Sequence, residues 1–118
     1  MNTGKTKYKM IFRTAVTGLS HYNYGLHAKE ISVGDELELQ AETSNRFDGN
    51  AVAVGHNSSR FGDEQIGWLS NQRDAGGKQV VCKMLEAGFE LKCVVISHDK
   101  ENARLDERLY VGVYAAQE

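Results

Sequence analysis

The sequence predicts a mostly β fold, a small antiparallel barrel or curled sheet with one or two short helices inserted near residues 70–87. Most apolar segments are short and alternate with polar residues, which is the two-residue period of a half-buried strand. After these, residues 78–87 space their apolar side chains at helical intervals. The chain also lacks proline, a residue that blunts exposed strand edges, so closure of the sheet is the expected protection against edge-to-edge pairing.

The length of 118 residues suits one domain, which we expect over residues 8–116 after a flexible tail at residues 1–7. Hydrophobic residues make up 41% and charged residues 25%, which is typical of a globular chain and not of a disordered one. No apolar run approaches the roughly 18 residues of a membrane span, and the N-terminus lacks the apolar part of a secretion signal. Cys82 and Cys93 are expected to be free thiols, so the predicted location is the cytoplasm, with no membrane partner.

The first strand is predicted over residues 8–16, with alternate side chains on one face: Met10, Phe12, Thr14 and Val16. A loop rich in tyrosine and histidine follows at residues 18–25. The second strand, over residues 36–42, alternates in the same way. It should form a hairpin with a short third strand at residues 51–54, through the turn at residues 45–50.

A polar connection is expected over residues 55–64 and a fourth strand over residues 65–69. In the helical region Gly76-Gly77 interrupts the pattern, and Gly88 is the expected C-terminal stop. Between them lies one apolar stripe: Val80, Val81, Met84 and Leu85. Two last strands each place three apolar side chains on one face, Leu91, Cys93 and Val95, then Leu109, Val111 and Val113.

Phe47 and Asp48, in the turn at residues 45–50, are the first candidate functional pair. Turn chemistry explains the asparagines and the Asp-Gly step, because these residues tolerate positive φ and bond back to the backbone. It does not explain a large apolar ring. Phe47 could stack on a nucleobase while Asp48 accepts a hydrogen bond from a hydroxyl. Alternatively, Phe47 covers the barrel edge and Asp48 only shapes the turn.

Other candidates have similar alternatives. In the loop after the first strand, Ser20, His21 and Tyr22 could build the second wall of a stacking slot, or Tyr22 packs inward with its hydroxyl satisfied at the rim. Trp68 lies beneath a ligand or in the core. Asn71 is at the expected helix start. It could contact a phosphate held by the free N–H groups there, or it could simply face solvent.

The charge balance and the missing catalytic motifs narrow the function classes. With 14 basic and 16 acidic residues, the net charge of −2 argues against a protein that coats nucleic acid, although a pocket for one strand end is compatible with it. The four histidines have no zinc-ligand spacing. No nucleophile elbow occurs, and the adjacent carboxylates fall in polar loops. We therefore expect no enzyme activity, no metal and no cofactor.

Four segments, in this order, resemble a HIRAN domain: residues 17–22, 33–39, 42–54 and 65–69. The most specific is Asn45 through Val52, which matches the pattern Asn-x-aromatic-Asp-x-Asn-Ala-aliphatic. The resemblance covers roughly residues 11–114. It implies a barrel similar to OB and SH3-like barrels, in a stand-alone module of bacterial or phage type. It also implies binding of single-stranded DNA at a free 3′ end, in DNA repair or replication, with a helicase or nuclease as protein partner.

By position, the resemblance implies nucleic-acid contacts at Ser20, His21, Tyr22, Phe47, Asp48, Trp68 and Asn71. Phe47 would be the stacking ring and Asp48 the acceptor for the terminal 3′-hydroxyl. Ser20 and His21 stand where the helicase-attached domain has arginine and tyrosine, and Asn71 stands where it has a basic residue. Each change removes a phosphate or base contact. A second interpretation therefore stays open, that of a protein-interaction barrel that has lost DNA-end binding.

Overall fold

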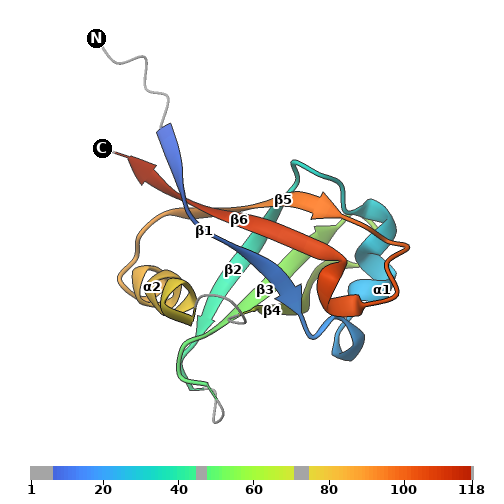
Figure 1. Cartoon of the computed structure of the whole chain (residues 1–118), viewed down its shortest axis with the longest axis horizontal. Helices are drawn as coiled ribbons and strands as arrows, with labels where there is room; N and C mark the ends of the chain where they lie inside the picture. Colours follow the sequence, from blue (N-terminus) through green and yellow to red (C-terminus); the bar gives the residue numbers. More distant parts are fainter. Residues whose placement is uncertain (1–6, 45–47, 71–74, 118) are drawn as a thin grey trace.

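The fold is a closed antiparallel barrel of six strands, seen in a computed structural model that describes residues 7–44, 48–70 and 75–117 (Figure 1). The strands are β1 (Lys7–Thr17), β2 (Glu36–Glu42), β3 (Ala51–Ser58), β4 (Gly62–Leu69), β5 (Leu91–His98) and β6 (Leu109–Gln117). Their order around the barrel is β1-β4-β3-β2-β5-β6. The mostly β, small-barrel prediction is confirmed.

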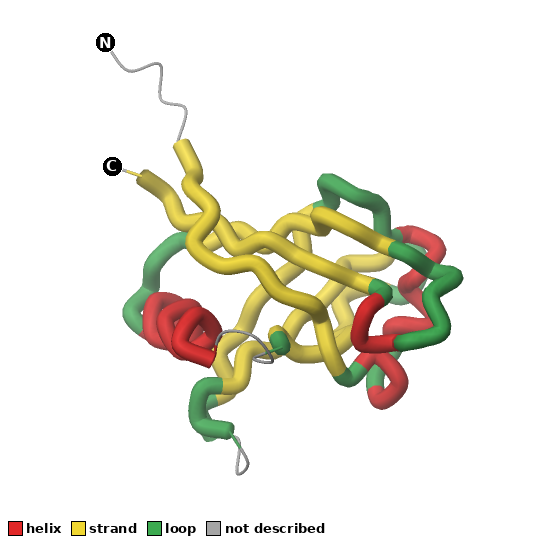
Figure 2. The backbone as a smooth tube through the Cα atoms, viewed as in Figure 1, coloured by secondary structure: helices red, strands yellow, loops and turns green. Residues whose placement is uncertain are grey.

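β1 closes the barrel because it pairs with two different strands along its length. Figure 2 shows the course of the backbone around the barrel. Its first part pairs with β6, from Lys7 opposite Gln117 to Ala15 opposite Tyr110. Its last two residues pair with β4 instead, which sets Thr17 opposite Trp68. The end of β1 and the end of β4 are therefore fixed side by side, and both lead into segments that carry candidate site residues.

The core follows the predicted alternation in β5 and β6, whereas in β1 the pairing shifts register between Met10 and Phe12, so Met10 is 38% exposed and does not share the buried face of Phe12 and Val16. β6 buries Leu109, Val111 and Val113 completely, and β5 buries Cys93 and Val95 opposite them. The remaining fully buried strand residues include Val16, Val52, Val54 and Ile66. Cys82 and Cys93 are free and buried, and burial raises the pKa of the Cys93 thiol to about 12.

β3 and β4 are longer than the alternation indicated. The expected polar connection at residues 55–64 is wrong, because β3 continues to Ser58 and β4 begins at Gly62. The polar side chains there are buried against hydrogen-bonding partners from a distant segment: Ser58 Oγ donates to Glu30, and the His56 ring bonds to His27. Hydrogen bonds from Ser58 and Ser59 also hold the pKa of Glu30 down at about 2.

The helix α2 (Ala75–Glu86) also departs from the sequence-based expectation, because it runs through Gly76-Gly77 without interruption. Its buried face carries Lys78, Val81 and Cys82, whereas Val80 is 53% exposed. The C-terminal stop is where it was expected. Gly88 has a φ of 84°, and Phe89 N donates to the Met84 carbonyl at 3.0 Å. α2 packs against β2 and β3.

The segment after β1 contains helical turns where only a loop was expected. These are η1 (Leu19–His21), α1 (Tyr24–His27) and η2 (Ala28–Glu30), and a fourth turn, η3 (Leu105–Glu107), precedes β6. Figure 1 shows α1 and α2 at opposite ends of the barrel. Within the described ranges, neither helix has the length and apolar character needed to cross a membrane.

Candidate nucleic-acid interface

Tyr22 and Trp68 form an aromatic pair at the joined ends of β1 and β4. Trp68 Nε1 donates a hydrogen bond of 2.7 Å to the Tyr22 hydroxyl. Their ring centroids are 6.1 Å apart at an interplanar angle of 75°, an edge-to-face arrangement. Tyr22 is 36% exposed and Trp68 is partly exposed. The two rings therefore contact each other at the surface and neither is part of the fully buried core.

Two glycines make this pairing possible. Gly18 has a φ of 76°, and a Cβ added to it would lie 3.3 Å from Trp68 Cδ1. Gly67 lies so close to β1 that a Cβ would come within 2.4 Å of the Thr17 carbonyl oxygen. The first glycine turns the chain toward Trp68, and the second allows β4 to approach the end of β1.

Ser20 and His21 precede this pair in η1, and both side chains are exposed. The turn is closed by His21 N, which donates to the Gly18 carbonyl at 3.0 Å. Both residues therefore lie on the surface next to Tyr22 in the chain, as a contact role requires.

Asp48 lies in the turn that leads into β3. Its Oδ1 accepts a 2.8 Å hydrogen bond from Asn50 N, and its carbonyl accepts one of 3.2 Å from Ala51 N. Its other carboxylate oxygen accepts from Lys78 of α2. The Lys78 hydrogen bond, opposed by burial, holds the pKa of Asp48 below its usual value, and the Asn50 bond and the Lys78 charge add to this. The carboxylate is therefore ionised at neutral pH and paired with a cation.

Lys78 was not among the residues singled out from the sequence. Its side chain is only 7% exposed, while that of Asp48 is 36% exposed. A signal was present, because Lys78 stands three and four residues before Val81 and Cys82 and so shares their buried face. A lysine on the buried face of a helix needs a carboxylate partner, and this one lies in the turn of the hairpin.

The structure brings some of the candidate residues together. Tyr22 contacts Trp68, and Trp68 is opposite Ala53, two residues along β3 from the point where the Asp48 turn ends. Asp48 bonds to Lys78 of α2, whereas Tyr22 lies just before α1, so the turn and the aromatic pair are linked through β3 but lie toward different ends of the barrel. Phe47 and Asn71 lie outside the described residues, so their predicted roles stay predictions.

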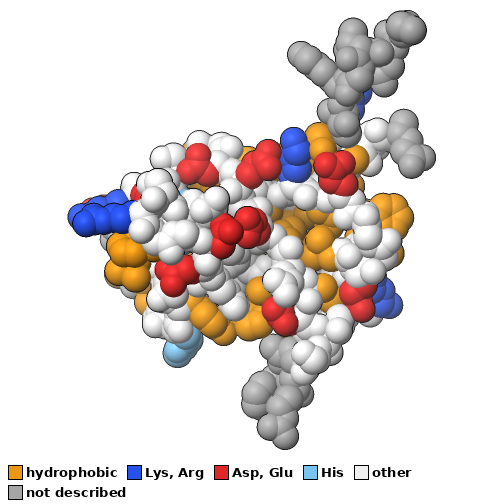
Figure 3. Space-filling view, turned by 180° about the vertical axis from the view of Figure 1, so that it is seen from behind, with side chains coloured by type: hydrophobic (Ala, Val, Ile, Leu, Met, Phe, Trp, Pro, Cys, Tyr) orange, Lys and Arg blue, Asp and Glu red, His pale blue; other side chains and the backbone are white. Residues whose placement is uncertain are grey.

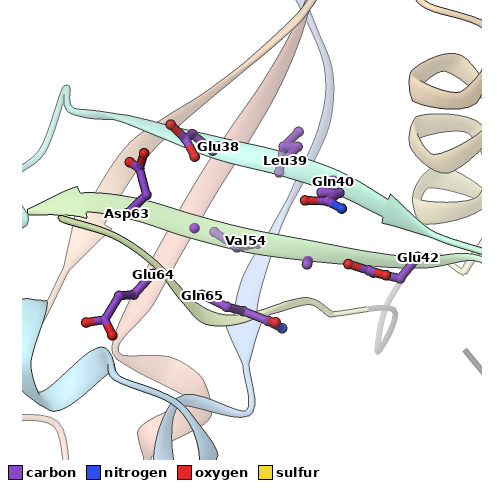
Figure 4. A pocket seen from close by; sticks show the side chains of 10 residues that line it. Glu38, Leu39, Gln40, Glu42, Val54, Asp63, Glu64 and Gln65 are labelled. Atoms are coloured by element: carbon purple, nitrogen blue, oxygen red, sulfur yellow. The ribbon is translucent and has the colours of Figure 1, made fainter.

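An acidic groove lies beside this region, on the outer face of β2, β3 and β4 (Figure 4). Its volume is about 240 Å³. Ala53 and Gly55 of the middle strand lie in it, and its carboxylates are Glu38, Glu42, Asp63 and Glu64. The face of the molecule shown in Figure 3 likewise carries more Asp and Glu than Lys and Arg side chains. Such a groove repels phosphate, so a DNA strand is expected to avoid it.

Comparison with known proteins supports the fold assignment. No protein-family model matches the sequence, and no curated protein matches it. A structural-genomics protein from Lactobacillus plantarum superposes with a TM-score of 0.73 at 16% identity, covering 97% of this chain and 100% of the other. The HIRAN domain of human HLTF superposes with a TM-score of 0.63 at 17% identity, covering 99% of this chain and 84% of that one. The chain therefore has a HIRAN-like fold.

Proposed function

We propose that this HIRAN-like barrel is a non-catalytic, cytoplasmic module that binds single-stranded DNA at a free 3′ end during DNA repair or replication. The observation that carries the proposal is the exposed Tyr22–Trp68 pair at the junction of β1 with β4. Aromatic rings at a surface stack on bases of any sequence, at about 1–3 kcal/mol per base. A helicase or a nuclease is the proposed protein partner.

The Asp48–Lys78 ion pair is the proposed reason why a 3′-hydroxyl end is preferred to a 3′-phosphate end. A carboxylate oxygen has two lone pairs, so Asp48 can accept a hydrogen bond from a 3′-hydroxyl while keeping its bond from Lys78. A 3′-phosphate would instead bring negative charge against this carboxylate and lose the hydroxyl donor. In this proposal Phe47 supplies a further stacking ring, Ser20 and His21 contact bases beside Tyr22, and Asn71 contacts the backbone.

Fluorescence anisotropy tests the end recognition directly. We expect a short single-stranded oligonucleotide with a 3′-hydroxyl to bind at least about tenfold more tightly than the same strand with a 3′-phosphate, since tenfold corresponds to only about 1.4 kcal/mol. Phe47→Ala should weaken binding of the hydroxyl form by more than about 1 kcal/mol with an unchanged circular dichroism spectrum. Equal affinity for the two strand ends would refute 3′-end recognition.

The acidic groove favours a second candidate function, a protein-interaction barrel. Its four carboxylates come from β2 and β4, and Ser20, His21 and Asn71 replace residues that would contact DNA in the helicase-attached domain. A basic segment of a partner protein would complement this surface. Absence of oligonucleotide binding near physiological salt would support this function over DNA binding.

A further inference from the structure

Residues 18–31, which carry Tyr22, are fastened to the barrel through a buried chain of polar groups. His27 of α1 is fully buried, and both of its ring nitrogens are engaged. Its Nε2 lies 2.9 Å from Glu64 Oε1 on β4, and its Nδ1 lies 2.7 Å from His56 Nδ1 on β3. Asn23 donates to the other Glu64 oxygen at 2.8 Å. One carboxylate therefore holds residues at both ends of α1.

The proton positions in this chain follow from donor and acceptor rules. Glu64, as a carboxylate, can only accept, so His27 Nε2 carries the proton. The Nδ1 of a neutral His27 is then an acceptor, and His56 Nδ1 donates to it. One added proton can go to His56 Nε2 and leave both hydrogen bonds intact. A second would put N–H groups on both Nδ1 atoms, which face each other at 2.7 Å.

The surroundings of His56 set the direction of its titration. Burial and the neighbouring His27 oppose its charged form, while Glu30 of η2 and Asp35 before β2 favour it, and on balance its pKa is lowered. On the other side, His27 faces Glu64 and the Phe61 ring, whose centroid is 6.1 Å away. An exposed histidine takes a proton near pH 6.5. The hydrogen-bonded arrangement of Glu64, His27 and His56, the closed form, is therefore fully populated above that pH and is disfavoured as the pH falls.

We propose that Glu64, His27 and His56 form a proton-operated latch, which keeps Tyr22 against Trp68 at neutral pH and releases it in acid. The consequence for DNA rests on the proposed function: acid weakens binding of a single strand at the aromatic pair. Each extra proton bound by the open form shifts the closed-to-open ratio tenfold per pH unit. The buried side chains of Leu19 and Ile31 are apolar and stay packed in the core, so the opening is local.

Trp68 is the only tryptophan, so it reports on the latch without any DNA. We expect its indole signal and its nuclear Overhauser contacts to Tyr22 to change between pH 6.5 and 5. His56→Gln should move this transition at least one pH unit lower, because glutamine donates to His27 Nδ1 and does not titrate. His98→Gln is the matched control, since His98 also bonds segment 18–31, at Tyr24 and the Ile31 carbonyl, without touching a latch residue, and its midpoint should equal that of the wild type. Equal midpoints in the wild type and His56→Gln would overturn the latch.

Ring-nitrogen NMR of the wild type covers the case in which His56→Gln fails to fold. His27 and His56 should together bind one proton before the Tyr22–Trp68 contact changes. Two bound protons with that contact intact would overturn the proposal.

Anisotropy with a 3′-hydroxyl oligonucleotide at pH 7.5 and 5.5 separates the latch from the proposed function. The wild type should bind about tenfold more weakly at pH 5.5, and His56→Gln should lose no affinity. Absence of DNA binding at both pH values would refute the proposed function and the effect of the latch on DNA. The Trp68 signal, which needs no DNA, would still test whether the latch exists. If the affinity for DNA is unchanged while the Trp68 signal shows that the latch is open, the latch does not control DNA binding.

Discussion

Asp48 shows how one residue can serve both the fold and a ligand site. Its two carboxylate oxygens accept from Asn50 and Lys78, which ties the hairpin turn to α2. The same contacts orient the carboxylate and keep it ionised, since the pKa of Asp48 is lowered mainly by the Lys78 bond. A ligand hydroxyl would meet an acceptor that is already charged and fixed in place.

Replacing Lys78 with methionine tests this arrangement at the residue scale. Lys78→Met keeps the apolar stem and removes the charge, so the pKa of Asp48 should rise toward its ordinary value in a carboxyl NMR titration. A lowered native pKa contributes stability above the unfolded value near 4, which is lost as the pH falls through the native pKa. The variant should therefore lose less stability in acid than the wild type does.

Lys92→Met is the matched control for Lys78→Met. Lys92 pairs with Glu36 at 3.5 Å, and both side chains are well exposed, so this pair contributes little. The Asp48 titration should be unaffected by it. An Asp48 midpoint that is the same in Lys78→Met and in the wild type would contradict the role given to Lys78.

Among the elements, the contact between β1 and β4 decides whether the barrel closes and where Trp68 lies. Only Val16 and Thr17 of β1 pair with β4, opposite Leu69 and Trp68. This short junction depends on Gly67, which lies against the β1 backbone. Closure of the barrel and the position of the aromatic pair therefore depend on the same few atoms.

Gly67→Ala should destabilise the protein by about 1–3 kcal/mol in urea unfolding, the usual cost of forcing a methyl group into a packed site. The added Cβ would lie 2.4 Å from the Thr17 carbonyl oxygen and 2.8 Å from Val16 Cγ1, so the two strands must separate. Gly25→Ala is the control, because nothing lies within 4 Å of its Cβ position. In α1 it should leave stability unchanged or raise it by up to about 1 kcal/mol. Equal stability of the two variants would contradict the close-contact account.

The elements also differ in how well the sequence predicted them. β2 was predicted at its observed bounds, Glu36–Glu42, because its alternation is local and a glycine turn precedes it. The helical turns after β1 were missed because their buried polar groups are satisfied from far along the chain. His27 finds Glu64 37 residues away, and Tyr24 finds His98 74 residues away. No local pattern contains such pairs.

The candidate site divides in the same way. Tyr22 and Trp68 could be singled out because aromatic residues in a polar loop and beside a glycine are conspicuous, but their mutual hydrogen bond depends on how β1 meets β4. The Lys78–Asp48 pair joins residues 30 positions apart and needs the helix face to be known.

For the molecule as a whole, an acidic groove lies beside the exposed aromatic pair, since Trp68 is opposite Ala53, which lines that groove. The net charge is −2, and the groove across β2, β3 and β4 is lined by carboxylates. The aromatic pair lies at the junction of β4 with β1, next to segment 18–31. A DNA strand end at the aromatic pair would meet two rings, and the acidic groove would discourage a longer strand from crossing β3.

An NMR titration with a short 3′-hydroxyl single strand tests the central claim most directly. We expect chemical-shift changes to concentrate on the Tyr22 amide, the Trp68 indole N–H and the Asp48 amide, with those of Glu38 and Asp63 in the groove unmoved. No shifts at millimolar strand, or shifts confined to the groove, would contradict the claim that this aromatic pair and Asp48 bind DNA.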